Sequence, residues 1–210
     1  MKPDRSDFTD AEWRIIQRYR TPRAVQGFLR TLSYNHDDSQ RSFREVLKHK
    51  RAHCLEAALT AAAILEQHGY PPIVLSFESI DTLDHVIYIY QHDGLWGAIA
   101  RSRDAGLDGR KPVFRRPRDL LLSYVDPYVD FTGRITGYAV VDLEQMERKI
   151  NWRFSSRNLW ALEKYLIDLP HREVRTSDRR YAMLLNRYKE FRAQFPKKQA
   201  TYYDNKHLWL

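Results

Sequence analysis

The stretch that decides the fold is Arg51-Ala52-His53-Cys54-Leu55-Glu56-Ala57-Ala58-Leu59-Thr60-Ala61-Ala62-Ala63-Ile64-Leu65-Glu66-Gln67-His68-Gly69, which holds the only cysteine of the 210-residue chain. Ala and Leu, two of the strongest helix formers, dominate it, and Gly69 is the residue type that commonly ends a helix. Apolar side chains run round nearly the whole circumference from Ala57 to Leu65. Such a helix is wrapped by other elements, so we expect it to form the centre of the core.

Cys54 falls in the first turn of this helix. Unpaired backbone N–H groups and the positive end of the helix dipole stabilise a thiolate there and can also hold an oxyanion. The position therefore suits a nucleophile. A free cysteine is also among the most buried residue types and often only packs in a core, so a structural cysteine is the alternative.

A histidine downstream favours the chemical interpretation. His85 opens a predicted strand over residues 84–90, and the turn Asp93-Gly94 leads into a second strand over residues 95–102. A Cys at the start of a helix and a His at the edge of a sheet form the arrangement of papain-like nucleophilic catalysis. We therefore expect Cys54 to be the nucleophile and His85 its base.

The order of motifs between residues 25 and 102 supports the same pair. It comprises Leu32-Ser33-Tyr34-Asn35, a short helix, Cys54 at the head of the alanine-rich helix, Gly69-Tyr70-Pro71, a strand, His85 and the turn Gly94-Leu95-Trp96. In this order and spacing the chain resembles the transglutaminase-like domain of the papain-like thiol enzyme superfamily. The resemblance implies an α+β fold with the Cys54 helix against an antiparallel sheet, and it carries over Cys54 and His85 as catalytic residues.

One departure from that family concerns the third catalytic residue. The family usually has an Asp a few residues after the Trp, and alignment puts Ala100 at that position. Antiparallel pairing across a two-residue Asp93-Gly94 turn sets His85 opposite Ser102 on the same face of the sheet. We therefore expect Ser102, or Asp104 two residues on, to orient the imidazole. A change of one residue in turn length would move both to the other face.

Further candidates concern the oxyanion and the substrate. The resemblance implies that a side chain upstream of the cysteine completes the oxyanion hole, which makes Tyr34 or Asn35 a candidate. A turn with a helix cap is the plainer interpretation of the same two residues. Arg101, Arg103 and Arg110 follow the second strand, so an acidic substrate is expected if they reach the cleft. The substrate is otherwise a peptide, a protein or a small acyl compound.

The chain divides at about residue 150. We expect residues 1–150 to form the thiol-enzyme domain with added N-terminal helices, capped by Thr9, Thr21 and Ser42. Residues 151–210 carry amphipathic stripes that predict a helical C-terminal extension packed on this domain.

Two finer predictions concern the second half of the chain. We expect the extension helices to follow caps at Ser155 or Ser156 and at Ser177. Residues 103–118, rich in Gly, Arg and Pro, are expected to form a loop.

Composition and charge set the alternative function. The chain has 43% hydrophobic and 13% aromatic residues, which argues against disorder. A net charge of +8 arises from 35 Lys and Arg against 27 Asp and Glu, with basic clusters at residues 41–51, 110–118 and 172–180. The chain carries no recognised nucleic-acid motif. The alternative is thus a catalytically inactive scaffold that binds nucleic acid or another polyanion.

Several classes are not expected. The sequence has no apolar run of membrane length and no leader, which predicts a cytoplasmic protein without a membrane partner. One Cys cannot make a structural zinc centre and the histidines show no ligand spacing, so we expect no metal. No cofactor is expected either. The function that these patterns favour is cysteine-dependent acyl transfer or hydrolysis of an amide, thioester or ester.

Overall fold

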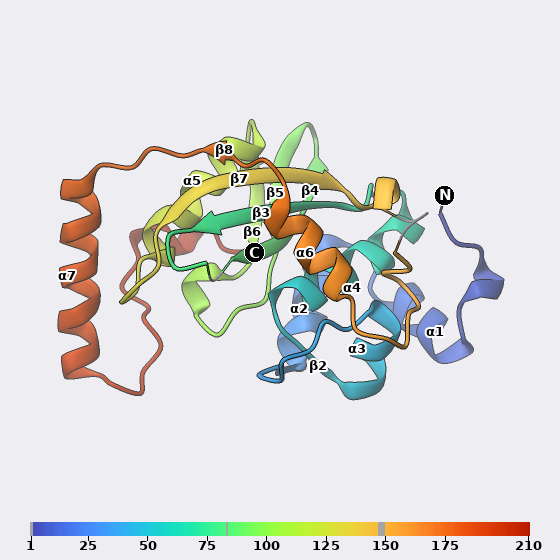
Figure 1. Cartoon of the computed structure of the whole chain (residues 1–210). Helices are drawn as coiled ribbons and strands as arrows, with labels where there is room; N and C mark the ends of the chain where they lie inside the picture. The colour runs from blue at the N-terminus through green and yellow to red at the C-terminus, as the bar shows by residue number, and fades with distance from the viewer. Residues whose placement is uncertain (1, 83, 147–149) are drawn as a thin grey trace.

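The computed structural model describes residues 2–82, 84–146 and 150–210 and confirms the α+β class. Its centre is an antiparallel sheet of six strands in the order β6-β5-β4-β3-β7-β8 (Figure 1). The strands are β3 (Ile73–Ser79), β4 (His85–His92), β5 (Leu95–Ile99), β6 (Arg110–Phe114), β7 (Ile135–Asp142) and β8 (Arg172–Glu173).

Helices from the N-terminal third gather on one face of this sheet. They are α1 (Asp10–Arg18), α2 (Pro22–Thr31), α3 (Phe43–His49) and α4 (Cys54–Leu65). The predicted caps are confirmed, because the hydroxyls of Thr9, Thr21 and Ser42 each accept a hydrogen bond from the backbone N–H three residues on. Each cap satisfies an N–H that has no partner inside its helix.

Helix α4 is the core helix that its sequence predicts. Every residue from Leu55 to Leu65 is buried. Val86 and Tyr88 of β4 pack in the same cluster, so the helix lies against the centre of the sheet. A short 3-10 turn follows, and Gly69 ends it with a φ of 88°, a left-handed conformation that suits glycine.

The β4–β5 hairpin has the predicted turn and register. Asp93 and Gly94 both have positive φ values, 50° and 75°, as a two-residue turn with the twist of a hairpin requires. Tyr88 pairs with Ile99 and Tyr90 with Gly97.

The opposite face of the sheet carries a second apolar cluster, under α5 (Pro117–Tyr128). Successive side chains of a strand point to opposite faces, so Ile87 and Ile89 meet α5 while Val86 and Tyr88 meet α4. His85 is the first residue of β4 and lies at the end of the sheet.

The C-terminal sixty residues join both the core and the sheet. Leu162 and Leu166 of α6 (Trp160–Asp168) belong to the same core cluster as α4. Two buried hydrogen bonds of 2.7 and 2.6 Å join the Arg153 guanidinium to the Glu66 carboxylate at the end of α4. Helix α7 (Asp178–Gln194) stands at the left end of the molecule in Figure 1 and is capped by Ser177 as predicted.

Three local predictions were wrong. Residues 103–118 are not only a loop, because β6 lies within them and pairs with β5. The side chain of Arg110, the first residue of β6, is fully buried. Helix α6 begins at Trp160 and not after Ser155 or Ser156, since the Ser155 hydroxyl accepts from Arg157 N in a local turn instead. The extension is not only helical, because β8 pairs with β7 at the edge of the sheet.

Among the described residues, no helix has both the length and the apolar character needed to cross a membrane.

Candidate functional site

A cavity of about 400 Å³ opens where the start of α4 meets the end of the sheet. Both predicted catalytic residues line it, Cys54 from α4 and His85 from β4. Ser102 and Asp104, which follow β5, line it too. The lining extends from Tyr34 to Tyr203, so distant parts of the chain contribute to one cavity.

Cys54 is the first residue of α4 and is partly buried. Burial alone would raise the pKa of its thiol, but hydrogen bonds and positive charge from His53 and His85 outweigh it. The pKa of Cys54 is therefore held well below its ordinary value. A thiolate at neutral pH is the reactive form of a cysteine nucleophile.

His85, at the end of the sheet, lines the same cavity as Cys54 and is one of the groups that lower the pKa of the thiol. Its side chain is only 4% exposed and packs edge-on against the Phe77 ring, with the Tyr128 ring 6.5 Å away. Nε2 of His85 is buried and has no hydrogen-bond partner in the described structure. The imidazole is thus placed by packing and not by a hydrogen bond at this nitrogen.

Ser102 and Asp104 share the cavity but do not hydrogen bond to Nε2 of His85. The Ser102 hydroxyl accepts from Asp104 N at 3.3 Å, and the Asp104 carboxylate lies 3.6 Å from Arg192. The predicted pairing of His85 with Ser102 does not form because β5 ends at Ile99.

Gln26 of α2 contacts the backbone just beyond the end of β5. Its side-chain amide accepts from Ala100 N at 3.0 Å and donates to Ala100 O at 2.9 Å. Both polar groups of the Ala100 backbone are then taken by a side chain of α2 and not by the neighbouring strand.

His53 is a site residue that the sequence analysis missed. It precedes Cys54 as the N-cap of α4, and its Nε2 lies 2.8 Å from Ser39 O. Burial lowers the pKa of His53, but hydrogen bonding and charge from Cys54, together with the Glu56 carboxylate, raise it to about 9. The signal that could have found it is the His-Cys-x-Glu order, since a Glu at the third helical position folds back onto the cap residue.

Glu56 organises this end of α4 although it is fully buried. Its carboxylate accepts from His53 N at 3.0 Å, from Arg41 N at 2.9 Å and from Asn35 Nδ2 at 3.0 Å to each oxygen. These donors belong to the loop that crosses the head of the helix. The loop is thereby tied to the turn that carries Cys54.

Tyr34 and Asn35 reach the site because strand β1 (Ser33–Tyr34) pairs in parallel with β2 (Arg51–Ala52), directly before Cys54. The Asn35 amide donates to Glu56 and to the Ser39 hydroxyl, so its hydrogens are used within the loop. This placement matches the structural interpretation of Asn35.

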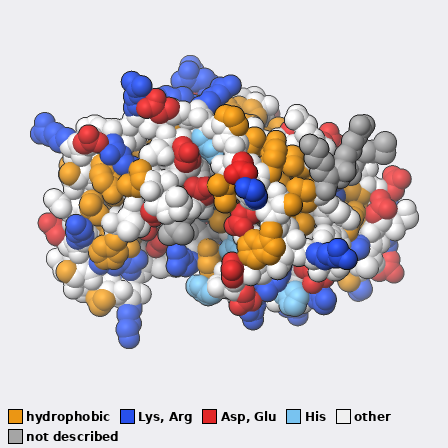
Figure 2. All heavy atoms as spheres, in the orientation of Figure 1, with side chains coloured by type: hydrophobic (Ala, Val, Ile, Leu, Met, Phe, Trp, Pro, Cys, Tyr) orange, Lys and Arg blue, Asp and Glu red, His pale blue; other side chains and the backbone are white. Residues whose placement is uncertain are grey.

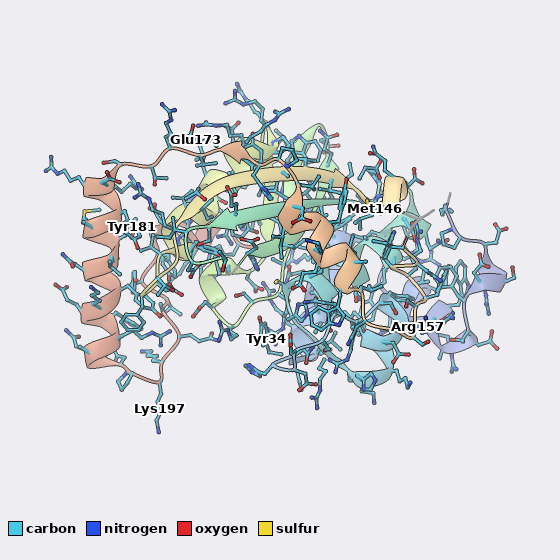
Figure 3. The ribbon with its side chains drawn as sticks, viewed as in Figure 1. Tyr34, Met146, Arg157, Glu173, Tyr181 and Lys197 are labelled. Atoms are coloured by element: carbon cyan, nitrogen blue, oxygen red, sulfur yellow. The ribbon has the colours of Figure 1, made fainter. Side chains whose placement is uncertain are left out.

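Tyr34 has a different position, on the cavity wall; it is labelled in Figure 3. Burial, and then the negative charge of Cys54, raise the pKa of its hydroxyl to about 12. The hydroxyl stays protonated at neutral pH and remains a hydrogen-bond donor.

The expected arginine contacts are divided. Arg103 lines the cavity, whereas Arg101 is outside its described lining and donates to Leu32 O at 3.0 Å. Arg110 is buried and donates to Gly106 O at 2.7 Å. Only one of the three arginines therefore reaches the cleft.

Carboxylates outnumber cations on the cavity wall. The acidic residues that line it are Asp37, Asp38, Asp81, Asp84, Asp104, Asp130 and Glu163. Burial, and to a smaller extent neighbouring carboxylates, raise the pKa of both Asp84 and Glu163. In Figure 2 several acidic side chains lie near the middle of the face, with Lys and Arg standing out at its upper and left margins.

The basic clusters are partly paired with carboxylates. Arg41 and Arg51 both contact Asp37, Arg116 pairs with Asp119, and Arg180 pairs with Asp126. These ion pairs reduce the charge available to a polyanion.

Residues 2–82, 84–146 and 150–210 contain no group of three or more His, Cys, Asp or Glu arranged to hold a metal ion. The chain matches no protein-family model and no curated protein.

Proposed function

We propose that this protein is a cysteine-dependent acyltransferase or hydrolase that acts on an amide, a thioester or an ester. One observation carries the proposal: Cys54, at the head of a buried helix, lines one cavity together with His53 and His85, and these two histidines lower the pKa of its thiol. A cysteine that only fills the core would have its pKa raised by burial, whereas that of Cys54 is lowered.

The reaction begins when the Cys54 thiolate attacks the substrate carbonyl. An S–C bond forms and the carbonyl oxygen becomes an oxyanion. When this intermediate collapses, the bond to the leaving group breaks and the leaving group takes a proton from His85, which enters the cycle as an imidazolium protonated by solvent and becomes neutral in this step. Water or an amine then attacks the acyl-enzyme while His85 removes its proton, and the Cys54 thiolate leaves. Hydrolysis and transfer differ only in the acceptor.

Two kinds of donor are available for the oxyanion. The first-turn N–H groups of α4 lack partners inside the helix, and Cys54 is the first residue of that turn. The Tyr34 hydroxyl, which stays protonated, lines the same cavity.

We also propose that the core is of the transglutaminase-like, papain-like kind. The order of a cysteine helix, a strand, a strand that begins with His85 and a hairpin supports this. Ala100 is buried in an apolar cluster, so the family's third residue has no counterpart at that position.

A binding scaffold without catalysis is the second candidate, and the lone Nε2 of His85 favours it. In a catalytic triad, the histidine nitrogen that does not face the nucleophile donates a hydrogen bond to a carboxylate, and this carboxylate stabilises the imidazolium. Without such a partner, the cavity would hold its ligand without forming a covalent intermediate.

Intact-protein mass spectrometry after mixing with aryl esters and aryl thioesters tests the proposal. The wild type should gain one acyl mass on Cys54, Cys54→Ala should gain none, and His85→Ala should form and release the acyl group more slowly. The matched control is His92→Ala at the exposed end of the same strand, which should behave as the wild type. If no ester or thioester acylates the wild type, the enzyme proposal fails and the binding scaffold remains.

A further inference from the structure

Two imidazoles line the same cavity as Cys54 and lower the pKa of its thiol, but they differ in their hydrogen bonding. Nε2 of His53 lies 2.8 Å from Ser39 O and 3.7 Å from Oε1 of the buried Glu56. Nε2 of His85 has no hydrogen-bond partner among the described residues. Of the two rings, only that of His53 is therefore oriented by a hydrogen bond at Nε2.

We propose that His53 is a positioning residue that keeps Cys54 as a thiolate through an imidazolium–thiolate ion pair, which leaves His85 to carry the proton during turnover. The inference rests on the proposed function, although it concerns the thiol before any substrate binds.

The hydrogen bond to Ser39 fixes the state of the His53 ring. A carbonyl oxygen only accepts, so Nε2 must carry a hydrogen, and in the neutral ring Nδ1 is then a bare acceptor. When Nδ1 takes the Cys54 proton, the S–H bond breaks and an N–H bond forms. Each ring N–H then has an acceptor, the Ser39 carbonyl on one side and the thiolate on the other.

Charges around His53 favour its protonated form. The groups that face it are Cys54 and Glu56 on α4 and Glu163 on α6. Burial raises the pKa of Glu163, and the charge of His53 opposes that rise. Arg41 opposes these anionic groups, with its Nη1 3.7 Å from Glu56. The anionic groups outweigh burial and hold the pKa of His53 at about 9. The ion pair therefore exists from above the low pKa of the thiol up to about pH 9.

Alkylation of Cys54 by iodoacetamide, followed from pH 4 to pH 10, tests the division of roles. His53→Gln should move the half-maximal rate toward the value near pH 8.5 of an ordinary thiol and lower the rate at pH 6.5 by about tenfold or more, since one pKa unit is tenfold in thiolate. His92→Gln, an exposed histidine, should leave the profile unchanged. Thermal unfolding of each variant shows whether it remains folded.

A second measurement does not need the His53 variant to fold. NMR titration of the histidine rings should show His53 with a raised pKa in the wild type that falls by one unit or more in Cys54→Ala, because the thiolate partner is gone. A His53 pKa unchanged by Cys54→Ala, or an alkylation profile unchanged by His53→Gln, would overturn the proposal. Neither measurement uses an acyl substrate, so failure of the proposed function and failure of this inference are seen separately.

Discussion

Glu56→Gln is the substitution from which the structure allows the most detailed expectation. The carboxylate is fully buried, and its two oxygens accept from the His53 and Arg41 backbone N–H groups and from the Asn35 amide. Glutamine has nearly the same shape but keeps only one acceptor oxygen, and its NH₂ group must face a donor. At least one charge-assisted hydrogen bond is lost and one donor is left unsatisfied.

The expected loss of stability follows from these contacts. A hydrogen bond to a charged group contributes about 1.5–3 kcal/mol, and a buried donor without a partner costs about 1–3 kcal/mol. We therefore expect the free energy of unfolding to fall by about 2–5 kcal/mol. For a chain of this size the midpoint of thermal unfolding should drop by about 5–15 °C.

The assay for Glu56→Gln is urea unfolding followed by circular dichroism, together with iodoacetamide alkylation of Cys54. The alkylation profile should also move to higher pH, because His53 loses the carboxylate 3.7 Å from its ring. Glu190→Gln, on the exposed surface of α7, is the matched control and should change stability by less than about 0.5 kcal/mol. If Glu56→Gln is as stable as this control, the carboxylate does not tie the loop to α4 and the reasoning is refuted.

Three further predictions concern the rest of the molecule. Arg153→Ala should cost about 3–5 kcal/mol in urea unfolding because it removes the buried ion pair between the Arg153 guanidinium and the Glu66 carboxylate. The double variant Glu66→Gln/Arg153→Met should recover much of that loss, and equal stability of the two variants would contradict this. Because the cavity wall is acidic, kcat/KM should be higher for an aryl ester of a lysine-type substrate than for that of a glutamate-type substrate. Glu163→Gln should reduce this ratio of kcat/KM values. A higher kcat/KM for the glutamate ester would argue for Arg103 as the substrate contact. Any binding of nucleic acid should weaken steeply with salt and survive Cys54→Ala, and a lack of binding at low salt would remove the polyanion alternative.

Sequence reasoning worked best where the deciding contact is local. The caps at Thr9, Thr21, Ser42 and Ser177 each join a hydroxyl to a backbone N–H three residues on, so the pattern is visible in four letters. The turn at Asp93-Gly94 depends on two residues that tolerate positive φ. The same holds for α4, since its apolar circumference predicts a buried helix from composition alone.

Sequence reasoning failed where contacts between distant parts of the chain matter. β5 ends at Ile99, so Ser102 lies outside the strand pairing that was expected to place it opposite His85, and the Ala100 backbone bonds to Gln26, seventy-four positions earlier. A propensity or an alternating pattern holds no record of such a partner.

The sequence by itself determined that Cys54 begins a buried helix and that His85 begins a strand, because helix caps, apolar periodicity and turn residues act over a few neighbouring positions. Only the tertiary structure decided which of the two imidazoles, His53 or His85, is oriented by a hydrogen bond, and which group provides that bond. The Ser39 carbonyl accepts from the His53 ring, and the buried Glu56, which also accepts from the Asn35 amide, accepts from the His53 backbone N–H. These hydrogen bonds form when the loop closes over α4. Each of these bonds needs a fixed distance and direction between groups that the unfolded chain does not hold together, so their energy exists only after the core has packed.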